Sequence, residues 1–260
     1  MRDILLSAWV WTSTALLLIA WVPIIAVVRL TDRDPALYRS GYTLRLLGRS
    51  MTYLNPFWDV KVEGTPPDNP RNPYVVVGNH LSQGDPPVVS RLPWEMKWVA
   101  KKELFDLPVA GWLLRLSGDI CVDRNDPASR SRVIDKARRY IDHKCSVMFF
   151  PEGTRSRDGR VHQFANGAFR LALDAGVPVL PIVIDGTQEA LPKHSLRFRT
   201  NPETMRVKVL PPVDPRAEGL TEVDTLRAHV RQQIVAQLAE WRGTSPDAVD
   251  ALTSRSAPSS

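Results

Sequence analysis

The sequence YVVVGNHLSQGD, residues 74–85, joins a run of valines to a turn that holds one histidine and one aspartate. A short continuous apolar run is typical of a strand that is buried on both faces in a parallel sheet. Gly78 and Gly84 let the backbone turn sharply once the strand has ended. We therefore expect His80 and Asp85 to lie on a loop at the end of a buried strand.

Strands and helices are expected to alternate on both sides of this segment. Apolar runs bounded by turn residues predict strands, and apolar residues at three- and four-residue spacings predict helices. The alternation predicts the α/β class, with a mainly parallel sheet flanked by helices. Asp34 and Pro35 are expected at the N-cap and in the first turn of the earliest of these helices. The expected strands cover residues 57–64, 74–80, 145–150, 177–184 and 205–213, and the expected helices cover residues 34–54, 127–143, 166–176 and 223–238.

The N-terminus carries an uncharged apolar run from Ile4 to Val28. This run is long enough to cross roughly 30 Å of hydrocarbon, and it exceeds the apolar core of a signal peptide, which is about 7–15 residues. Pro23 lies near its far end, so the run either spans a membrane or turns back as a re-entrant helix. Arginines are more numerous after the run than before it, which predicts a globular part on the cytoplasmic face of the inner (plasma) membrane. Those that follow the run are Arg29, Arg33, Arg39, Arg45 and Arg49.

Length and composition indicate one sizeable domain with attachments. The chain has 260 residues, and 43% of them are apolar, which is enough for one buried core. We expect an N-terminal membrane-embedded helical segment in residues 1–55 and the α/β domain in residues 56–242. The polar composition of residues 243–260 predicts a disordered tail.

Charge and motifs argue against several classes of protein. The net charge is +6, but the basic residues are scattered and no zinc-finger spacing or basic helix accompanies them, so we expect no nucleic acid partner. An anionic membrane surface or a phosphorylated substrate accounts for the same charge. Cys121 and Cys145 form no CxxC pattern and are expected as free thiols. The sequence has no G-x-S-x-G, H-E-x-x-H, G-x-G-x-x-G or Walker motif, so we expect no metal, no cofactor and no serine nucleophile.

Three loops leave the expected carboxyl ends of strands, where open α/β sheets bind their ligands: GNHLSQGD, FPEGTRSRDG and PIVIDG. On the first loop, Asp85 is close enough in sequence to bond one ring nitrogen of His80. The other nitrogen would then be free to take a proton, as in a general base. The alternative is structural, because an aspartate before Pro86 is also typical of a helix N-cap, and a histidine in a turn can cap backbone groups.

The second loop places Glu152, Gly153, Thr154 and Arg155 directly after a buried strand. Such a loop can direct backbone amides and a guanidinium at a phosphate. The alternative is a charged surface turn with an internal Glu152–Arg155 ion pair, which would contribute little.

A third segment, residues 101–124, mixes cations with large apolar residues, in a pattern that suits a lipid with an anionic head and an apolar tail. Lys101, Lys102 and Arg124 are the cations in question. The alternative here is an ordinary amphipathic helix and strand.

These motifs resemble a known family. NHLSQGD resembles the N-H-x4-D motif of the glycerolipid acyltransferases, the family of 1-acyl-sn-glycerol-3-phosphate acyltransferases. The segments KKELFDLPVAGWLLRLSGDICVDR, FPEGTRS and VPVLPIVI are similar to its second, third and fourth motifs, in the same order. The resemblance covers about residues 74–184 and is specific as a set.

The resemblance implies a reaction and a role for each residue. His80 would deprotonate the sn-2 hydroxyl of a lysophospholipid, which then attacks an acyl thioester directly, and Asp85 would orient His80. Lys101, Arg124 and Arg155 would hold the acceptor phosphate, whereas Glu152, Gly153 and Thr154 would shape the loop. The donor would be acyl-CoA or acyl carrier protein, the product phosphatidic acid, and the other partners membrane lipids. An acyltransferase for another lysolipid or an aminolipid, and a non-catalytic lipid-binding membrane protein, remain alternatives.

Overall fold

The computed structural model describes residues 1–191, 197, 198 and 200–253. These residues form a seven-stranded sheet in the order β1-β7-β6-β2-β5-β3-β4. Every neighbouring pair is parallel except β6 and β7, so the predicted mainly parallel sheet is confirmed. The strands are β1 (Trp58–Gly64), β2 (Val75–Gly78), β3 (Met96–Lys101), β4 (Ile120–Val122), β5 (Ser146–Phe149), β6 (Val179–Asp185) and β7 (Glu203–Val209).

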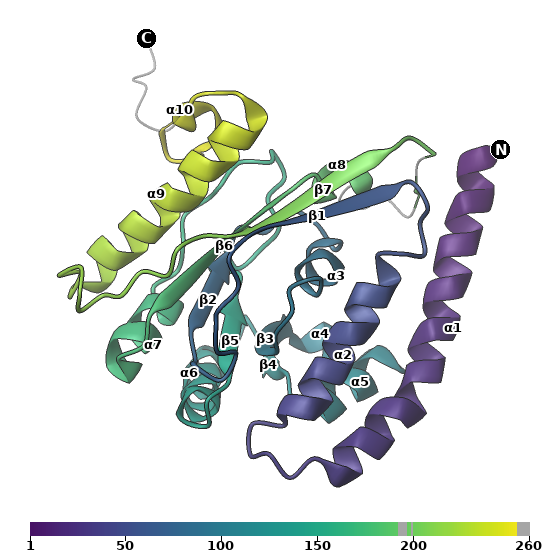
Figure 1. Cartoon of the computed structure of the whole chain (residues 1–260), viewed down its shortest axis with the longest axis horizontal. Coiled ribbons are helices and arrows are strands. Elements are labelled where there is room, and N and C mark those ends of the chain that lie inside the picture. Colours follow the sequence, from purple (N-terminus) through teal and green to yellow (C-terminus); the bar gives the residue numbers. More distant parts are fainter. Residues whose placement is uncertain (192–196, 199, 254–260) are drawn as a thin grey trace.

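Helices cover both faces of the sheet (Figure 1). Val75 and Val77 of β2 point into a core shared with α6, α7 and α9, whereas Val76 points into a core shared with α3. This alternation explains why the valine run is uninterrupted, since both faces of β2 are buried. The helices in the described residues are α1 (Arg2–Thr31), α2 (Tyr38–Met51), α3 (Asp85–Val89), α4 (Lys102–Phe105), α5 (Ala110–Ser117), α6 (Pro127–Asp142), α7 (Gly167–Ala175), α8 (Thr187–Ala190), α9 (Val223–Arg242) and α10 (Pro246–Val249).

Helix α1 lies along the outside of the domain and touches it near both ends (Figure 1). Near its start, the Asp3 carboxylate accepts hydrogen bonds from the backbone N–H (3.0 Å) and the hydroxyl (2.8 Å) of Thr200. Near its end, Ile25 is fully buried against Leu47 of α2 and Leu113 of α5. It is the one helix in the described residues that is long and apolar enough to cross a membrane. Its outward face remains apolar and exposed.

Helix α2 begins later than predicted. Asp34 does not cap it; its carbonyl and carboxylate instead accept hydrogen bonds from the N–H groups of Leu37 and Ala36, which closes a turn before the helix. Leu37 then adopts a left-handed conformation, with φ 50°. The carboxylate of Asp32 bonds the backbone N–H (2.8 Å) and the hydroxyl (2.7 Å) of Ser40 in the first turn of the helix. The predicted N-cap, Asp34, lies three residues before the observed N-cap, Leu37, because Asp34 closes a turn instead.

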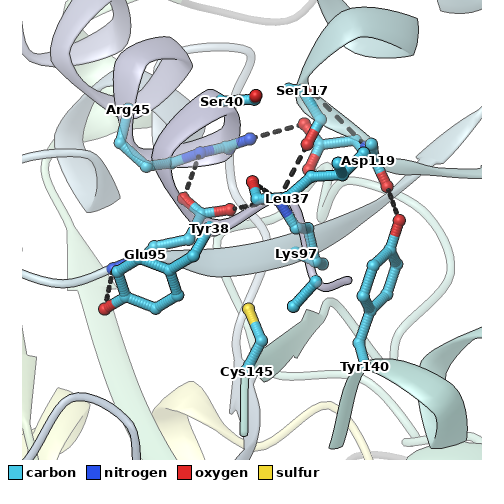
Figure 2. Close-up of polar contacts among 12 residues, drawn as sticks. Leu37, Tyr38, Ser40, Arg45, Glu95, Lys97, Ser117, Asp119, Tyr140 and Cys145 are labelled. Atoms are coloured by element: carbon cyan, nitrogen blue, oxygen red, sulfur yellow. Dashed lines mark hydrogen bonds and ion pairs between the residues drawn. The ribbon is translucent and has the colours of Figure 1, made fainter. Parts of the chain in front are cut away.

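A buried group of charges attaches α2 to the sheet (Figure 2). The Arg45 guanidinium pairs with Asp119 at 2.5 Å and Glu95 at 3.5 Å, and Lys97 pairs with Glu95 at 2.9 Å. None of the four side chains is more than 6% exposed, and their formal charges cancel. Gly41 of α2 lies against this group, and a Cβ atom at this position would come within 1.8 Å of a Glu95 carboxylate oxygen. The charges and this glycine fix the position of α2 closely.

The C-terminal segment contradicts the predicted disorder as far as it is described. Residues 244–253 include α10, which packs against α9 and has Val249 buried. The cause is an ion pair that the local composition does not reveal, because Arg231 of α9 binds both Asp250 oxygens, at 2.8 and 2.5 Å. The rest of the predicted tail, residues 254–260, lies outside the described residues.

Candidate active site

His80 and Asp85 meet at the carboxyl end of β2. The His80 Nδ1 atom lies 2.6 Å from Asp85 Oδ2, which also accepts the backbone N–H groups of Leu81 (2.7 Å) and Ser82 (3.0 Å). The hydroxyl of Thr187 donates to the other carboxylate oxygen. Asp85 is fully buried, so these donors replace water around the carboxylate. With Nδ1–H donating to Asp85, the Nε2 atom carries the free lone pair of the ring.

The N-cap interpretation of Asp85 is wrong by one position, whereas the contact between Asp85 and His80 is present. Asp85 is the first residue of α3, after Gly84 at the N-cap, and Pro86 occupies the next position of the helix. Its side chain turns back to the loop and bonds His80. The short helix therefore starts at the residue that orients the imidazole.

The FPEGTRS loop holds His80 from the neighbouring strand. The Glu152 carboxylate accepts the backbone N–H of His80 at 2.9 Å, and the His80 carbonyl accepts the N–H of Ser156 at 2.7 Å. The phenyl ring of Phe150 stacks on the imidazole, with 4.2 Å between ring centroids and 18° between planes. The His80 side chain is 15% exposed, so the ring is confined yet reachable.

The Glu152 carboxylate accepts hydrogen bonds from the backbone of two segments, at His80 and at His162. Its second oxygen accepts the N–H of His162 at 3.2 Å. Burial raises the pKa of Glu152 to about 7, against the opposing effect of these two backbone hydrogen bonds. Within the described part of the chain the Glu152 carboxylate makes no ion pair with Arg155, so the alternative of a surface Glu–Arg pair is wrong.

Gly153, Thr154 and Arg155 are the part of the loop that is accessible to solvent. Gly153 has φ 69° and is exposed, and no atom lies within 4 Å of the place where a Cβ would be. A residue with a side chain would be strained there, which accounts for glycine. Thr154 is exposed and Arg155 is partly exposed.

The three predicted cations follow one another along the same edge of the sheet. Arg155 comes after β5, Lys101 ends β3, and Arg124 comes after β4, and these strands are consecutive neighbours beyond β2. Neighbouring strands are about 4.8 Å apart, so the carboxyl ends of β2 to β4 span about 14 Å. Within residues 1–191, 197, 198 and 200–253, none of the three side chains forms an ion pair or side-chain hydrogen bond, which leaves them open to a ligand.

Phe150 and Thr187, which both contact the His80–Asp85 pair, were not predicted from the sequence. Thr187 directly follows the PIVIDG loop, on which no residue was named, and its hydroxyl bonds the Asp85 carboxylate. Phe150 directly precedes PEGTRS, where a phenylalanine at the end of an apolar strand is expected to be core. Only the β2–β5 pairing brings it onto the imidazole.

The α/β sheet and the hydrogen-bonded His80–Asp85 pair can be compared with known proteins. Residues 59–185 match the family model described as acyltransferase. The chain belongs to the 1-acyl-sn-glycerol-3-phosphate acyltransferase family.

Relatives from distant organisms support this membership. The mouse 1-acyl-sn-glycerol-3-phosphate acyltransferase alpha is 37% identical over 201 residues, which is 76% of this chain and 69% of the relative. The Salmonella typhimurium enzyme of this name is 32% identical over 205 residues, covering 74% of this chain and 79% of the relative. The match to the chloroplastic enzyme of Brassica napus, 36% identical, spans only 41% of that longer protein.

A solved structure extends the similarity to the whole fold. The crystal structure of the 1-acyl-sn-glycerophosphate acyltransferase PlsC from Thermotoga maritima superposes with a TM-score of 0.77 at 26% identity. The match covers 94% of this chain and 98% of that one.

Proposed function

We propose that this chain transfers an acyl group from a thioester donor to the sn-2 hydroxyl of 1-acyl-sn-glycerol-3-phosphate, giving phosphatidic acid. The observation that carries the proposal is the buried Asp85 carboxylate, which lies 2.6 Å from His80 Nδ1. The pair lies at the carboxyl ends of the strands, where Arg155, Lys101 and Arg124 also lie. The names of its relatives point to the same reaction.

In the proposed mechanism His80 is the general base. Its Nε2 removes the proton from the acceptor hydroxyl as the oxygen attacks the thioester carbonyl, and the imidazolium forms. Asp85 stabilises this cation and keeps the proton on Nδ1 beforehand. Collapse of the tetrahedral intermediate breaks the C–S bond, and the thiol leaves with the proton from His80. No acyl-enzyme is needed, because the hydroxyl attacks the donor itself.

The acceptor phosphate is assigned to the cations beyond β2. Arg155 is nearest in strand order and can bind two phosphate oxygens at once, whereas Lys101 and Arg124 act as further positive charges. Glu152 shapes the loop by holding the backbone of His80, and Gly153 and Thr154 form its exposed turn. The donor, acyl-CoA or acyl carrier protein, would approach the same edge.

Membrane association is assigned to α1. Leu16 and Ile19 on its outward face are 63% and 57% exposed, and a continuous apolar surface of this kind is stable against lipid rather than water. Because Asp3 and Ile25 both contact the globular domain, we infer that α1 lies along the membrane with the domain instead of leaving it to cross the bilayer. The domain would then lie on the cytoplasmic face of the inner membrane, where the acyl-CoA or acyl carrier protein donor can reach it.

One assay tests the proposed reaction. The purified full chain is supplied with lysophosphatidic acid and a panel of acyl-CoA and acyl carrier protein donors, and products are identified by mass spectrometry. Phosphatidic acid and free thiol should form in equal amounts. Parallel reactions with lysophospholipids that carry larger head groups, and with an aminolipid, test the acceptor. Transfer to one of those acceptors in preference to lysophosphatidic acid would overturn the proposal, as would thiol release from none of the donors.

A further inference from the structure

The imidazole of His80 is the last member of a row of side chains in contact, which begins at Arg45 in α2 and continues through Trp98 and Phe150. Phe150 covers one face of the imidazole at 4.2 Å. The indole of Trp98, from β3, meets the Phe150 ring edge-on at 6.3 Å and 76°. On Trp98 in turn lies the guanidinium of Arg45, 4.7 Å from the ring centroid. The row therefore connects a helix that packs under α1 with the proposed base.

Phe150 supplies a constraint that Asp85 cannot. A hydrogen bond from Nδ1 to a carboxylate fixes one atom of the ring and leaves the plane free to tilt about that contact. A ring stacked at 18° fixes the plane and with it the direction of the Nε2 lone pair. Proton transfer depends on that direction, because a general base must lie within hydrogen-bond reach of the hydroxyl with good alignment.

The far side of the row is rigid for reasons of packing and charge. Trp98 is 6% exposed, and its backbone N–H donates to the Asp119 carboxylate at 3.0 Å. The same carboxylate pairs with Arg45 at 2.5 Å, so Asp119 holds both the backbone of Trp98 and the guanidinium that lies over the Trp98 ring. Arg45 in turn belongs to the buried charge group in Figure 2. Phe150 therefore packs against a buried tryptophan whose backbone is held by Asp119.

We propose that Phe150 is a positioning residue that sets the plane of the His80 imidazole, and that Trp98 and Arg45 brace it from α2. This proposal rests on the proposed function of His80 as the base. Phe150 touches neither the acyl donor nor the acceptor in this role, so its removal should slow proton transfer and leave substrate binding intact.

Two substitutions of neighbouring phenylalanines test the role. Phe150→Leu removes the stacked ring, and Phe149→Leu makes the same change on the opposite face of β5, where Phe149 packs into the other core. An aromatic pair contributes enough to change a rate by about 2- to 10-fold, so Phe150→Leu should lower kcat by about that factor with unchanged KM for both substrates. Phe149→Leu should lower the melting temperature and leave kcat unchanged. Phe150→Tyr keeps the ring and should restore kcat.

A spectroscopic measurement tests the stack without any assay of transfer. Protons above an aromatic face resonate upfield, so the His80 ring proton resonances should move downfield in Phe150→Leu and stay in place in Phe149→Leu and Phe150→Tyr. Trp98→Leu should give a smaller shift and a smaller loss of kcat than Phe150→Leu.

The outcomes separate the two proposals. If Phe150→Leu has wild-type kcat and wild-type His80 resonances, or if both leucine variants lose kcat equally, Phe150 is not a positioning residue. If Trp98→Leu changes neither kcat nor the His80 resonances, Trp98 and Arg45 do not help to position Phe150. A wild-type chain that transfers no acyl group to lysophosphatidic acid overturns the proposed function, whereas the resonances still test the stacking of Phe150 on His80 from which the role of Phe150 is inferred.

Discussion

Asp85 has more donors around it than a local turn needs. Its carboxylate receives two backbone N–H groups, a hydroxyl and the imidazole, all without exposure to solvent. An asparagine has the same shape, but its NH2 group would face donors where an acceptor is required, and it offers no charge to an imidazolium. The site therefore requires both the geometry and the charge of an aspartate.

We expect Asp85→Asn to lower acyl transfer by about 10²–10⁴-fold, the usual contribution of a positioned base, because His80 loses its orientation and tautomer. His80→Ala should lose a similar factor. Transfer by each purified variant is measured beside Asp59→Asn, a control on the exposed surface of β1. A folded Asp85→Asn or His80→Ala enzyme that keeps more than about a tenth of the wild-type rate would contradict the mechanism.

Glu152 makes the stability of the protein depend on pH. Because burial raises its pKa from 4.5 to about 7, the folded protein retains a proton that the unfolded chain has released. The stabilisation is complete below about pH 4.5 and decreases as the pH rises to about 7, by up to about 1.4 kcal/mol per pH unit. Glu152→Gln lacks this titration. The difference in unfolding free energy, wild type minus variant, should fall by about 2–3 kcal/mol between pH 4.5 and 7.5 in urea titrations.

A difference that stays constant over that range would mean that Glu152 is ionised in the folded protein at acidic pH. A constant offset between wild type and variant is expected in either case, because the amide replaces one acceptor of the backbone N–H groups of His80 and His162.

At the scale of elements, the loop after β5 divides its residues between two tasks. Glu152 and Ser156 turn inward to the His80 backbone, whereas Thr154 and Arg155 remain toward solvent. The loop therefore fixes the base with one set of groups and leaves the other set for a ligand.

Arg155→Ala tests the second task. A charge-assisted hydrogen bond contributes roughly 1.5–3 kcal/mol, so kcat/KM for lysophosphatidic acid should fall about 10- to 150-fold, while kcat/KM for the acyl donor falls less. Arg155→Lys should recover part of the loss, because a lysine binds phosphate at a single point. Arg170→Ala on the exposed surface of α7 is the matched control. Equal losses for both substrates, with a lowered melting temperature, would remove Arg155 from the phosphate site.

Elements with local periodicity were predictable from the sequence. The predicted helices at 127–143 and 166–176 agree with α6 and α7 to within one residue at each end, because apolar spacing, a capping Asp126 and a terminal Gly176 all act locally. Strand β3 was not predicted, because Lys97 looks like a surface residue until Glu95 neutralises it in the core. The ordered segment around α10 was not predicted either, because it depends on an ion pair between Asp250 and the distant Arg231.

The site was predictable where its residues are close in sequence. His80 and Asp85 are five positions apart, so a turn alone brings them together. The Phe150 stack and the Thr187 hydrogen bond depend on which strands become neighbours, and strand order is decided by packing across the whole domain.

At the scale of the whole molecule, the exposed apolar face of α1 is expected to hold the protein on lipid. Leu16→Glu together with Ile19→Glu should weaken binding to anionic vesicles more than about tenfold, because each side chain loses about 1.5–3 kcal/mol of burial in lipid. The buried contacts of α1 with α2 and α5 are untouched, so the melting temperature should change little. Vesicle co-sedimentation is compared with Leu252→Glu, a change at an exposed leucine that follows α10 and lies outside α1. Undiminished vesicle binding by the double variant would exclude this face as the attachment.

The contacts of α1 and β1 also determine when each becomes stable during synthesis. Every residue of β1 pairs with a residue of β7 about 145 positions later, and Asp3 bonds Thr200. At about 5–20 residues per second, ribosomes take roughly 7–30 s to make the stretch from β1 to β7. In the meantime β1 and the N-terminal end of α1 lack these partners, although the later half of α1 can already pack on α2. A nascent chain with an unpaired strand edge and a bare apolar helix is prone to aggregation. Lipid is available to α1 from the start, so the bilayer would act as its first folding partner. Cell-free translation without membranes should therefore give aggregated chains, not soluble but inactive enzyme.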